Sequence, residues 1–148
     1  MFSLRIIEYG SGDYQLMVSL RDAILRRPLG LTFSEEYLQQ EINDTLIGCF
    51  TREKGKGEII IGCCILTPVN TNTLQLRQMA VEKSYQGQGI GNSVLEFAEQ
   101  QAKTKSYTRL MMHARKEAVG FYERQGYTID GDEFVEVNIP HYEMSKQL

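Results

Sequence analysis

The sequence predicts a mixed α/β protein built around one strand–helix–strand crossover. Three apolar, β-branched runs follow one another between residues 45 and 81, and helical periodicity then alternates with short strand-like runs up to residue 130. The chain has 148 residues, of which 42% are hydrophobic and 24% charged. That length suits one domain that buries its own core, so we expect a single domain over residues 1–148.

The N-terminal half is expected to hold a strand, two helices and a β-hairpin. Leu16, Met17, Leu20 and Ile24 recur at the spacing of one helix face. The charged, glycine-containing stretch between residues 53 and 57 is typical of a hairpin turn. The expected elements are a strand from Leu4 to Tyr9, a helix capped by Asp13 and ended before Pro28, a short helix from Ser34 to about Gln40, and strands from Thr45 to Arg52 and from Glu58 to Leu66.

The C-terminal half is expected to alternate strands and helices. In the first strand, alternation places Gln78 on the same face as Leu74, Leu76 and Ala80. Gly126 is a candidate helix C-cap, and residues 131–138 are expected to form a loop. The expected elements are a strand from Thr73 to Val81, a helix marked by Ile90 through Ala102, a strand from Arg109 to Ala114, a helix from Glu117 to Gln125, and strands from Tyr127 to Asp130 and from Ile139 to Lys146.

Composition argues against several classes of protein. The 16 basic and 19 acidic residues give a net charge of −3, which disfavours a nucleic-acid binder. The longest apolar run has about eight residues, whereas a membrane-spanning helix needs about 20, and Arg5 comes too early for a signal peptide. Three cysteines, two histidines and no CxxC pair predict no metal site. We expect a protein of the reducing cytoplasm, with no membrane partner.

The most informative segment is a glycine-rich turn between the strand ending at Val81 and the following helix. Gly87, Gly89 and Gly91 leave backbone amides unobstructed at a helix N-terminus, which is the geometry of a phosphate site. A dinucleotide fingerprint would need glycine where Asn92 stands, and the Gly-Lys-Ser/Thr of a Walker loop is absent. A tight turn without any ligand is the alternative interpretation of these glycines.

Gln86, Gly89 and Gly91 resemble the donor-binding motif of the GNAT acyltransferase superfamily. The segment before the turn, Arg77 to Val81, is similar to the family's fourth strand. Downstream, residues 118–127 carry the family's Phe-Tyr, three residues, Gly, aromatic pattern. Residues 20–30 and 139–144 resemble the early and closing segments of one branch. The resemblance covers essentially the whole chain.

The resemblance implies a GNAT-type fold, with a mixed, mostly antiparallel central sheet of about seven strands flanked by about four helices. The fourth and fifth strands, Thr73 to Val81 and Arg109 to Ala114, would splay apart. It also implies an acetyl-CoA-dependent N-acetyltransferase that moves the acetyl group to a primary amine by direct attack in a ternary complex. The alternative is a non-catalytic acyl-CoA-binding or regulatory module on the same fold.

The resemblance further implies roles for individual residues. The amide of Val81 would polarise the thioester carbonyl, and Tyr122 would face the coenzyme A sulfur unless it serves only as core packing. Arg115 stands where many members carry an asparagine that contacts the cofactor. The implied cofactor-binding residues are Met79, Ala80, Val81, Gln86, Gly87, Gln88, Gly89, Ile90, Gly91, Asn92, Arg115 and Tyr122.

Several questions stay open at this level. The general base is Glu82, His113, His141, the acidic pair Glu41 and Asp44, or water. Cys63 or Cys64 is an alternative covalent nucleophile. The acceptor is a small-molecule or peptide amine of unknown identity, and the donor is acetyl-CoA or a longer acyl-CoA. The acidic residues Glu35, Glu36, Glu41 and Asp44 are either surface charge or attract a cationic amine. A homodimer is plausible for this family.

Overall fold

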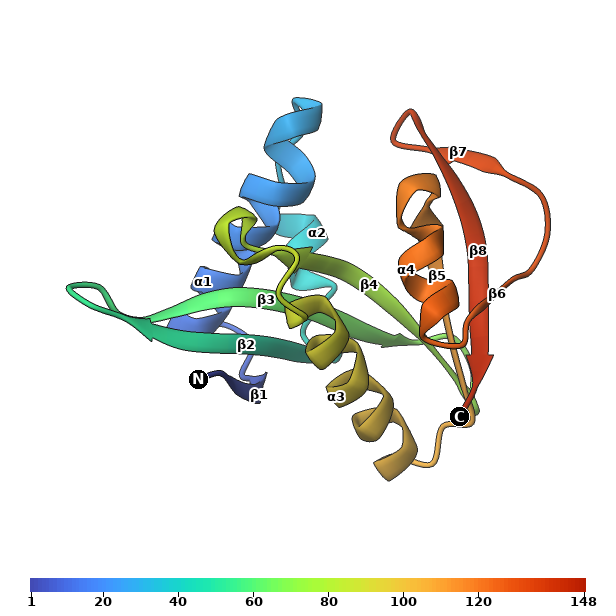
Figure 1. The fold of residues 1–148 in the computed structure, drawn as a ribbon, viewed down its shortest axis with the longest axis horizontal. Helices are drawn as coiled ribbons and strands as arrows, with labels where there is room; N and C mark the ends of the chain where they lie inside the picture. The colour runs from blue at the N-terminus through green and yellow to red at the C-terminus, as the bar shows by residue number, and fades with distance from the viewer. The chain divides into compact units, whose positions relative to one another are not determined.

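A computed structural model describes all residues from Met1 to Leu148. The packing of the backbone divides the chain into two compact units, which are described separately. Unit 1 comprises Met1–Leu66 and Gln78–Ala98, and unit 2 comprises Thr67–Arg77 and Glu99–Leu148. The fourth strand and the third helix each contribute residues to both units (Figure 1).

The fold is mixed α/β with four α-helices and eight strands in a mostly antiparallel sheet, which confirms the predicted class. The strands hydrogen bond in the order β1-β2-β3-β4-β5-β8-β6, and β7 also pairs with β8. The strands are β1 (Ser3–Ile7), β2 (Thr45–Glu53), β3 (Gly57–Pro68), β4 (Thr73–Val81), β5 (Arg109–Arg115), β6 (Thr128–Ile129), β7 (Phe134–Glu136) and β8 (Ile139–Gln147). The helices are α1 (Gly12–Arg21), α2 (Glu35–Gln39), α3 (Ile90–Thr104) and α4 (Val119–Arg124).

In unit 1, helices α1 and α3 cover opposite faces of the β2–β3 hairpin. Cys63 is fully buried in a core cluster that includes Met17 of α1 and Phe50 of β2. Its neighbour Gly62 faces the other way, where a side chain would collide with Ile90 of α3 at 2.8 Å. Successive residues of a strand point to opposite faces, so glycine at 62 is what allows α3 to approach β3 closely.

The α1 region differs from the prediction at both ends. Ser11, not Asp13, caps the helix, because its side chain accepts the amide hydrogen of Tyr14 at 3.2 Å. The chain also stays helical through Pro28, in a π-helix over Asp22–Arg26 and a 3₁₀ turn over Arg27–Leu29. Proline fits the first turn of a helix, where its missing N–H costs nothing, so it starts the 3₁₀ turn and does not break the helix.

A buried ion pair joins α1 to the segment that follows α2. Arg21 and Glu41 are 0% and 1% exposed, and two hydrogen bonds of 2.9 and 2.6 Å join their side chains. Tyr14 donates its hydroxyl to the same carboxylate at 2.7 Å. Burial, together with this carboxylate, raises the pKa of Tyr14. Charges this deep are tolerated only when they are paired and hydrogen bonded.

Unit 2 is organised around β8, which pairs with β5, β6 and β7. Tyr127 is buried and donates its hydroxyl to Glu99 at 2.8 Å, and Lys146 of β8 holds the same carboxylate at 3.1 Å. The sequence prediction missed β7 and gave about seven strands. The turn between β7 and β8 is made by Val137 and Asn138, both at positive φ. A β-branched residue there gives no turn signal, because such hairpin turns favour Asn and Gly.

Candidate functional site

The turn between β4 and α3 is held by hydrogen bonds that leave its tip open. The backbone amides of Tyr85 and Gln86 donate back to Glu82 and Lys83, in a single 3₁₀ turn over Lys83–Tyr85. The Gln86 side chain donates to the carbonyl of Val81 at 3.0 Å, and Gln88 donates to Ser84 at 3.2 Å. The Gln86 side chain therefore ties the turn to the end of β4, and the Gln88 side chain braces the turn internally.

The tip of the turn presents a row of unused amide donors. From Gly87 to Asn92 no backbone N–H has an acceptor in the chain, and the first return bond of α3 runs from Ser93 to Gly89 at 3.0 Å. Gly87 and Gly89 have φ of 78° and 82°, and open space surrounds the position of a Cβ atom at each. These donors lie at the positive end of the α3 dipole, an arrangement that suits an anion, and residues 87–92 are called the amide cradle below. The side-chain oxygen of Asn92 is buried and unpaired, so it does not place an acceptor among these backbone donors.

The last residues of β4 offer a second set of backbone donors. Glu82 donates its amide to Ile61 of β3 at 2.8 Å. Because amides alternate along a strand, those of Val81 and Met79 face the edge of β4 away from β3. Ala80 lies between them with its side chain buried. The parallel pairing of β4 with β5 runs only from Thr73 to Leu76, so it ends before this stretch begins.

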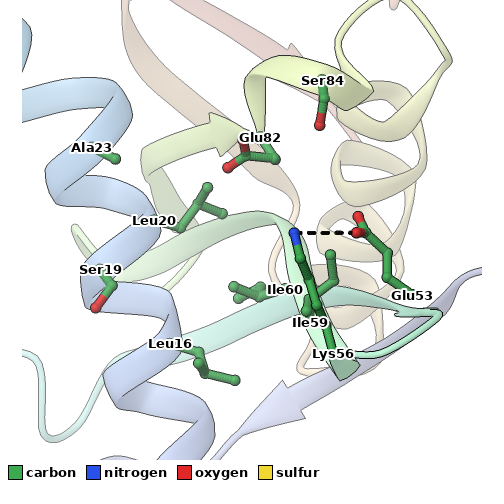
Figure 2. Close-up of a pocket in the computed structure, with 10 residues that line it drawn as sticks. All are labelled: Leu16, Ser19, Leu20, Ala23, Glu53, Lys56, Ile59, Ile60, Glu82 and Ser84. Carbon is green, nitrogen blue, oxygen red and sulfur yellow. Dashed lines mark ion pairs between the residues drawn. The ribbon is translucent and has the colours of Figure 1, made fainter.

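A pocket of about 370 Å³ in unit 1 adjoins the same loop (Figure 2). Its apolar wall comes from α1 and β3, and Glu82 and Ser84 of the loop close one side. Figure 2 shows the Glu82 side chain directed toward α1, while Glu53 pairs with Lys56 at 3.5 Å. Glu82 has no ion pair or side-chain hydrogen bond of its own. Its carboxylate is therefore not engaged by another group of the protein, which distinguishes it among the candidate bases.

The other predicted site residues, Tyr122 and Arg115, lie on unit 2. Tyr122 of α4 is 6% exposed and packs edge-on against Phe121 and Tyr127, at centroid distances of 5.0 and 5.9 Å. Its backbone carbonyl accepts the amides of Gln125 and Tyr127, which ties the helix end to the turn at Gly126. Arg115 ends β5, is half-buried and has no ion pair.

The two histidines lie together on unit 2 and share one carboxylate. His113 Nδ1 lies 3.1 Å from Glu136, and His141 Nε2 lies 3.7 Å from the same residue. His113 is partly exposed, whereas His141 is buried with its Nδ1 at 2.7 Å from the carbonyl of Ile139. A ring nitrogen facing a carbonyl must carry the proton, so the other nitrogen of His141 is its basic one. Both histidines thus have structural partners, which Glu82 lacks.

The acidic group expected at the surface near α2 is smaller than the sequence indicated. Glu35 and Glu36 are exposed in the first turn of α2, where they face the positive helix end. Glu41, however, is buried and neutralised by Arg21. It cannot attract a cationic ligand.

The cysteines Cys63 and Cys64 are buried thiols. Burial raises the pKa of Cys63 to about 12 and that of Cys64 well above its ordinary value of 9. Cys63 donates its thiol hydrogen to the carbonyl of Gln78 at 3.5 Å. Neither cysteine can supply a thiolate nucleophile near neutral pH.

We expect the burial of Cys63 and Cys64 to affect how stability depends on pH. At alkaline pH the folded chain keeps these thiol protons, whereas the unfolded chain releases them. The stabilisation is therefore complete below about pH 9 and is lost as pH rises from about 9 toward 12. The urea midpoint should fall over that range, and less so in a Cys63→Ala, Cys64→Ala double variant. Rapid labelling of both thiols by a disulfide reagent at pH 8 in the native state would contradict this.

The fold, the amide cradle and the free edge of β4 together define an acyltransferase of the GNAT type. A family model described as "Acetyltransferase (GNAT) domain" matches residues 30–148, and the chain belongs to this family. "Putative acetyltransferase BSU40680" of Bacillus subtilis strain 168 is 33% identical over 136 residues, which are 91% of this chain and 90% of that protein.

Two further comparisons cover different shares of the molecule. "Uncharacterized protein YyaT" of the same organism is 34% identical over 77 residues, and the match spans only about half of each chain, 52%. A crystal structure of an aminoglycoside 6′-N-acetyltransferase complexed with coenzyme A superposes with a TM-score of 0.79 at 14% identity, over 98% of this chain and 96% of that one. That similarity establishes the shared fold. None of this chain's helices combines the length and apolar character needed to cross a membrane.

Proposed function

We propose that this chain transfers an acetyl group from acetyl-CoA to a primary amine. The observation that carries the proposal is the row of unpaired amides from Gly87 to Asn92 at the N-terminus of α3. Backbone donors at a helix end suit a pyrophosphate, and the aminoglycoside 6′-N-acetyltransferase of the same fold is complexed with coenzyme A. The proposal treats residues 1–148 as one domain. The three cysteines are free thiols, which suits the reducing cytoplasm as its location. The assembly of two chains into a homodimer stays a prediction.

In this proposal each element of the site has one task. Amides of residues 87–92 hold the phosphates, with Gln86 bracing the loop, and Arg115 stays a candidate cofactor contact on the family resemblance alone. The edge of β4 from Met79 to Val81 pairs with the extended arm of the cofactor as an added strand would. The amide of Val81 donates to the thioester carbonyl oxygen, where negative charge develops during attack.

The transfer itself needs no covalent enzyme intermediate. The neutral amine forms a C–N bond to the acyl carbon, the C–S bond breaks, and the proton lost by nitrogen balances the one gained by sulfur. Tyr122 donates the proton to the departing thiolate. The buried, un-ionised state of Cys63 and Cys64 supports direct attack. Glu82 is the candidate base best supported by its surroundings, because its carboxylate is unpaired and lines a pocket.

Replacing Tyr122 by phenylalanine tests the role of its hydroxyl. We expect turnover to fall by roughly 100-fold, the lower end of what a general acid contributes, with the acetyl-CoA dissociation constant within about twofold. Tyr127→Phe is the matched control, since Tyr127 packs against Tyr122 but bonds to Glu99. Steady-state kinetics with calorimetry measure both effects. Unchanged turnover in Tyr122→Phe would reduce the residue to packing.

Release of free thiol from acetyl-CoA in the presence of a panel of amines tests the proposed reaction. Mass spectrometry of the product should find one added acetyl group on the amine nitrogen. Turnover with at least one amine is the expected result. Tight binding of coenzyme A without turnover on any amine would instead favour a non-catalytic binding module.

A further inference from the structure

Gln78 occupies an unusual place in β4. It has φ of 57°, in the left-handed region that residues other than glycine rarely adopt, and it directly precedes the Met79–Val81 edge. Such strained positions cost about 1–3 kcal/mol and cluster at functional sites. The sequence predicted an ordinary alternating strand here, so the strain comes from the surrounding structure and not from a local turn signal.

The side-chain amide of Gln78 is only half satisfied. Its Nε2 donates to the hydroxyl of Tyr37 on α2 at 3.1 Å. Its Oε1 is withdrawn from solvent and accepts no hydrogen bond. A buried acceptor without a donor costs about 1–3 kcal/mol. An N–H group of a bound molecule would remove that cost.

Tyr37, whose hydroxyl bonds Gln78, also contacts the guanidinium of Arg26 through its ring. Arg26 stacks over the rings of Phe33 and Tyr37, at 4.5 and 5.3 Å from their centroids, and the two rings stack on each other at 5.7 Å. No carboxylate lies within ion-pair distance of Arg26. Its neighbour Arg27, in contrast, pairs with Asp22 at 2.8 Å.

These cation–π contacts hold Arg26 in place without pairing its charge with a carboxylate. Arg21 approaches Phe33 as well, at 4.6 Å, but its charge is taken by Glu41. A guanidinium stacked on aromatic rings keeps its edge N–H groups free, in the fork geometry that binds a carboxylate through two bonds. The positive charge beside Tyr37 therefore favours an anionic group.

We propose that Arg26 and Gln78 form an acceptor subsite for a primary amine that carries a carboxylate, namely a free amino acid. Arg26 binds the carboxylate, and Gln78 Oε1 accepts an N–H of the amine, which places the nitrogen beside the Met79–Val81 edge. Tyr37 sets the spacing, because its ring contacts Arg26 and its hydroxyl holds Gln78. The subsite rests on the proposed acetyl transfer, and the bonds made and broken are those given above. Gln78 is a positioning residue and takes no proton.

The test compares amino acids with the same molecules lacking the carboxylate. Phenylalanine is paired with 2-phenylethylamine, histidine with histamine, and lysine with cadaverine, and thiol release from acetyl-CoA is followed for each. We expect kcat/KM at least about tenfold higher for the better amino acids than for their partners, since one ion pair of this kind contributes 1.4 kcal/mol or more. Equal or greater turnover of the decarboxylated partners overturns the subsite and leaves the acetyl transfer standing. No turnover on any compound overturns both.

Variants then assign the residues. Arg26→Gln should raise KM for the amino acid, leave kcat and the acetyl-CoA dissociation constant nearly unchanged, and remove the preference over the decarboxylated partner. Arg26→Lys should retain part of the preference for the amino acid over its decarboxylated partner. Arg27→Gln is the matched control, since Arg27 is adjacent, exposed and already paired. Gln78→Gly relieves the backbone strain, so it should fold while raising KM for both members of a pair. A preference that survives Arg26→Gln, or a Gln78→Gly variant with unchanged KM, contradicts the assignment.

Discussion

Gly89→Glu is expected to abolish binding of acetyl-CoA. The position has φ of 82° and nothing within 4 Å of where a Cβ would lie, so a side chain meets no steric clash there, although the left-handed backbone is strained for any residue but glycine. The new carboxylate would stand among the amides of residues 87–92 and repel the phosphates they are expected to hold. Loss of one or two charge-assisted hydrogen bonds, together with that repulsion, predicts an affinity lower by roughly 100-fold or more. Titration calorimetry with acetyl-CoA measures it.

Two variants separate charge from backbone strain at this position. Gly89→Ala adds the strain of a left-handed residue without the charge and should weaken binding far less. Gly10→Glu places the same carboxylate on another exposed glycine of unit 1, at φ of 79° with open space around it. It carries the same strain without touching the cradle. If Gly89→Glu bound acetyl-CoA as tightly as Gly10→Glu, the phosphate site would lie elsewhere.

Glu41→Gln is expected to be the most destabilising single change in unit 1. It leaves the fully buried guanidinium of Arg21 without its counter-charge and weakens the acceptor of the Tyr14 hydroxyl. Breaking a buried pair by removing one partner costs about 3–5 kcal/mol. The cost is a large part of the free energy of unfolding of a small domain. Urea denaturation followed by circular dichroism measures it as a lower midpoint.

The double variant Arg21→Met, Glu41→Leu gives the comparison. Removing both charges together leaves no buried guanidinium without a counter-charge, so the double variant should be much more stable than the Glu41→Gln variant. Glu36→Gln, on the exposed face of α2, should change the free energy of unfolding by less than about 0.5 kcal/mol and so leave the midpoint nearly unchanged. A Glu41→Gln midpoint equal to that of Glu36→Gln would show that the buried pair contributes nothing.

Elements whose signal is local were predictable from the sequence. The alternation from Thr73 to Val81 predicted β4 with its observed bounds. Ser34, where the short helix was expected to begin, caps α2 by accepting the amide hydrogen of Tyr37. The glycine spacing located the amide cradle, because glycine at positive φ and a helix start are both properties of a few neighbouring residues. Gly126, at φ of 95°, likewise ends α4 as predicted.

Features that depend on residues distant in sequence were missed. Nothing local to Glu41 shows that it pairs with Arg21 twenty positions away, so the sequence placed it at the surface, either as ordinary charge or as a group that attracts a cationic amine. Gln78 fits a strand pattern, and its left-handed backbone is visible only in the folded chain. The hairpin turn places Val137 at positive φ, where a β-branched residue gives no turn signal, and this hid β7.

Binding of coenzyme A by the intact chain is the most direct test of the central claim. Calorimetry with acetyl-CoA and with desulfo-CoA isolates the phosphate and pantetheine contacts from the reacting sulfur. The unpaired amides at the start of α3 predict one site per chain for both ligands, with affinities of the same order. Absence of binding for both ligands would contradict the cofactor site and the acetyltransferase function together.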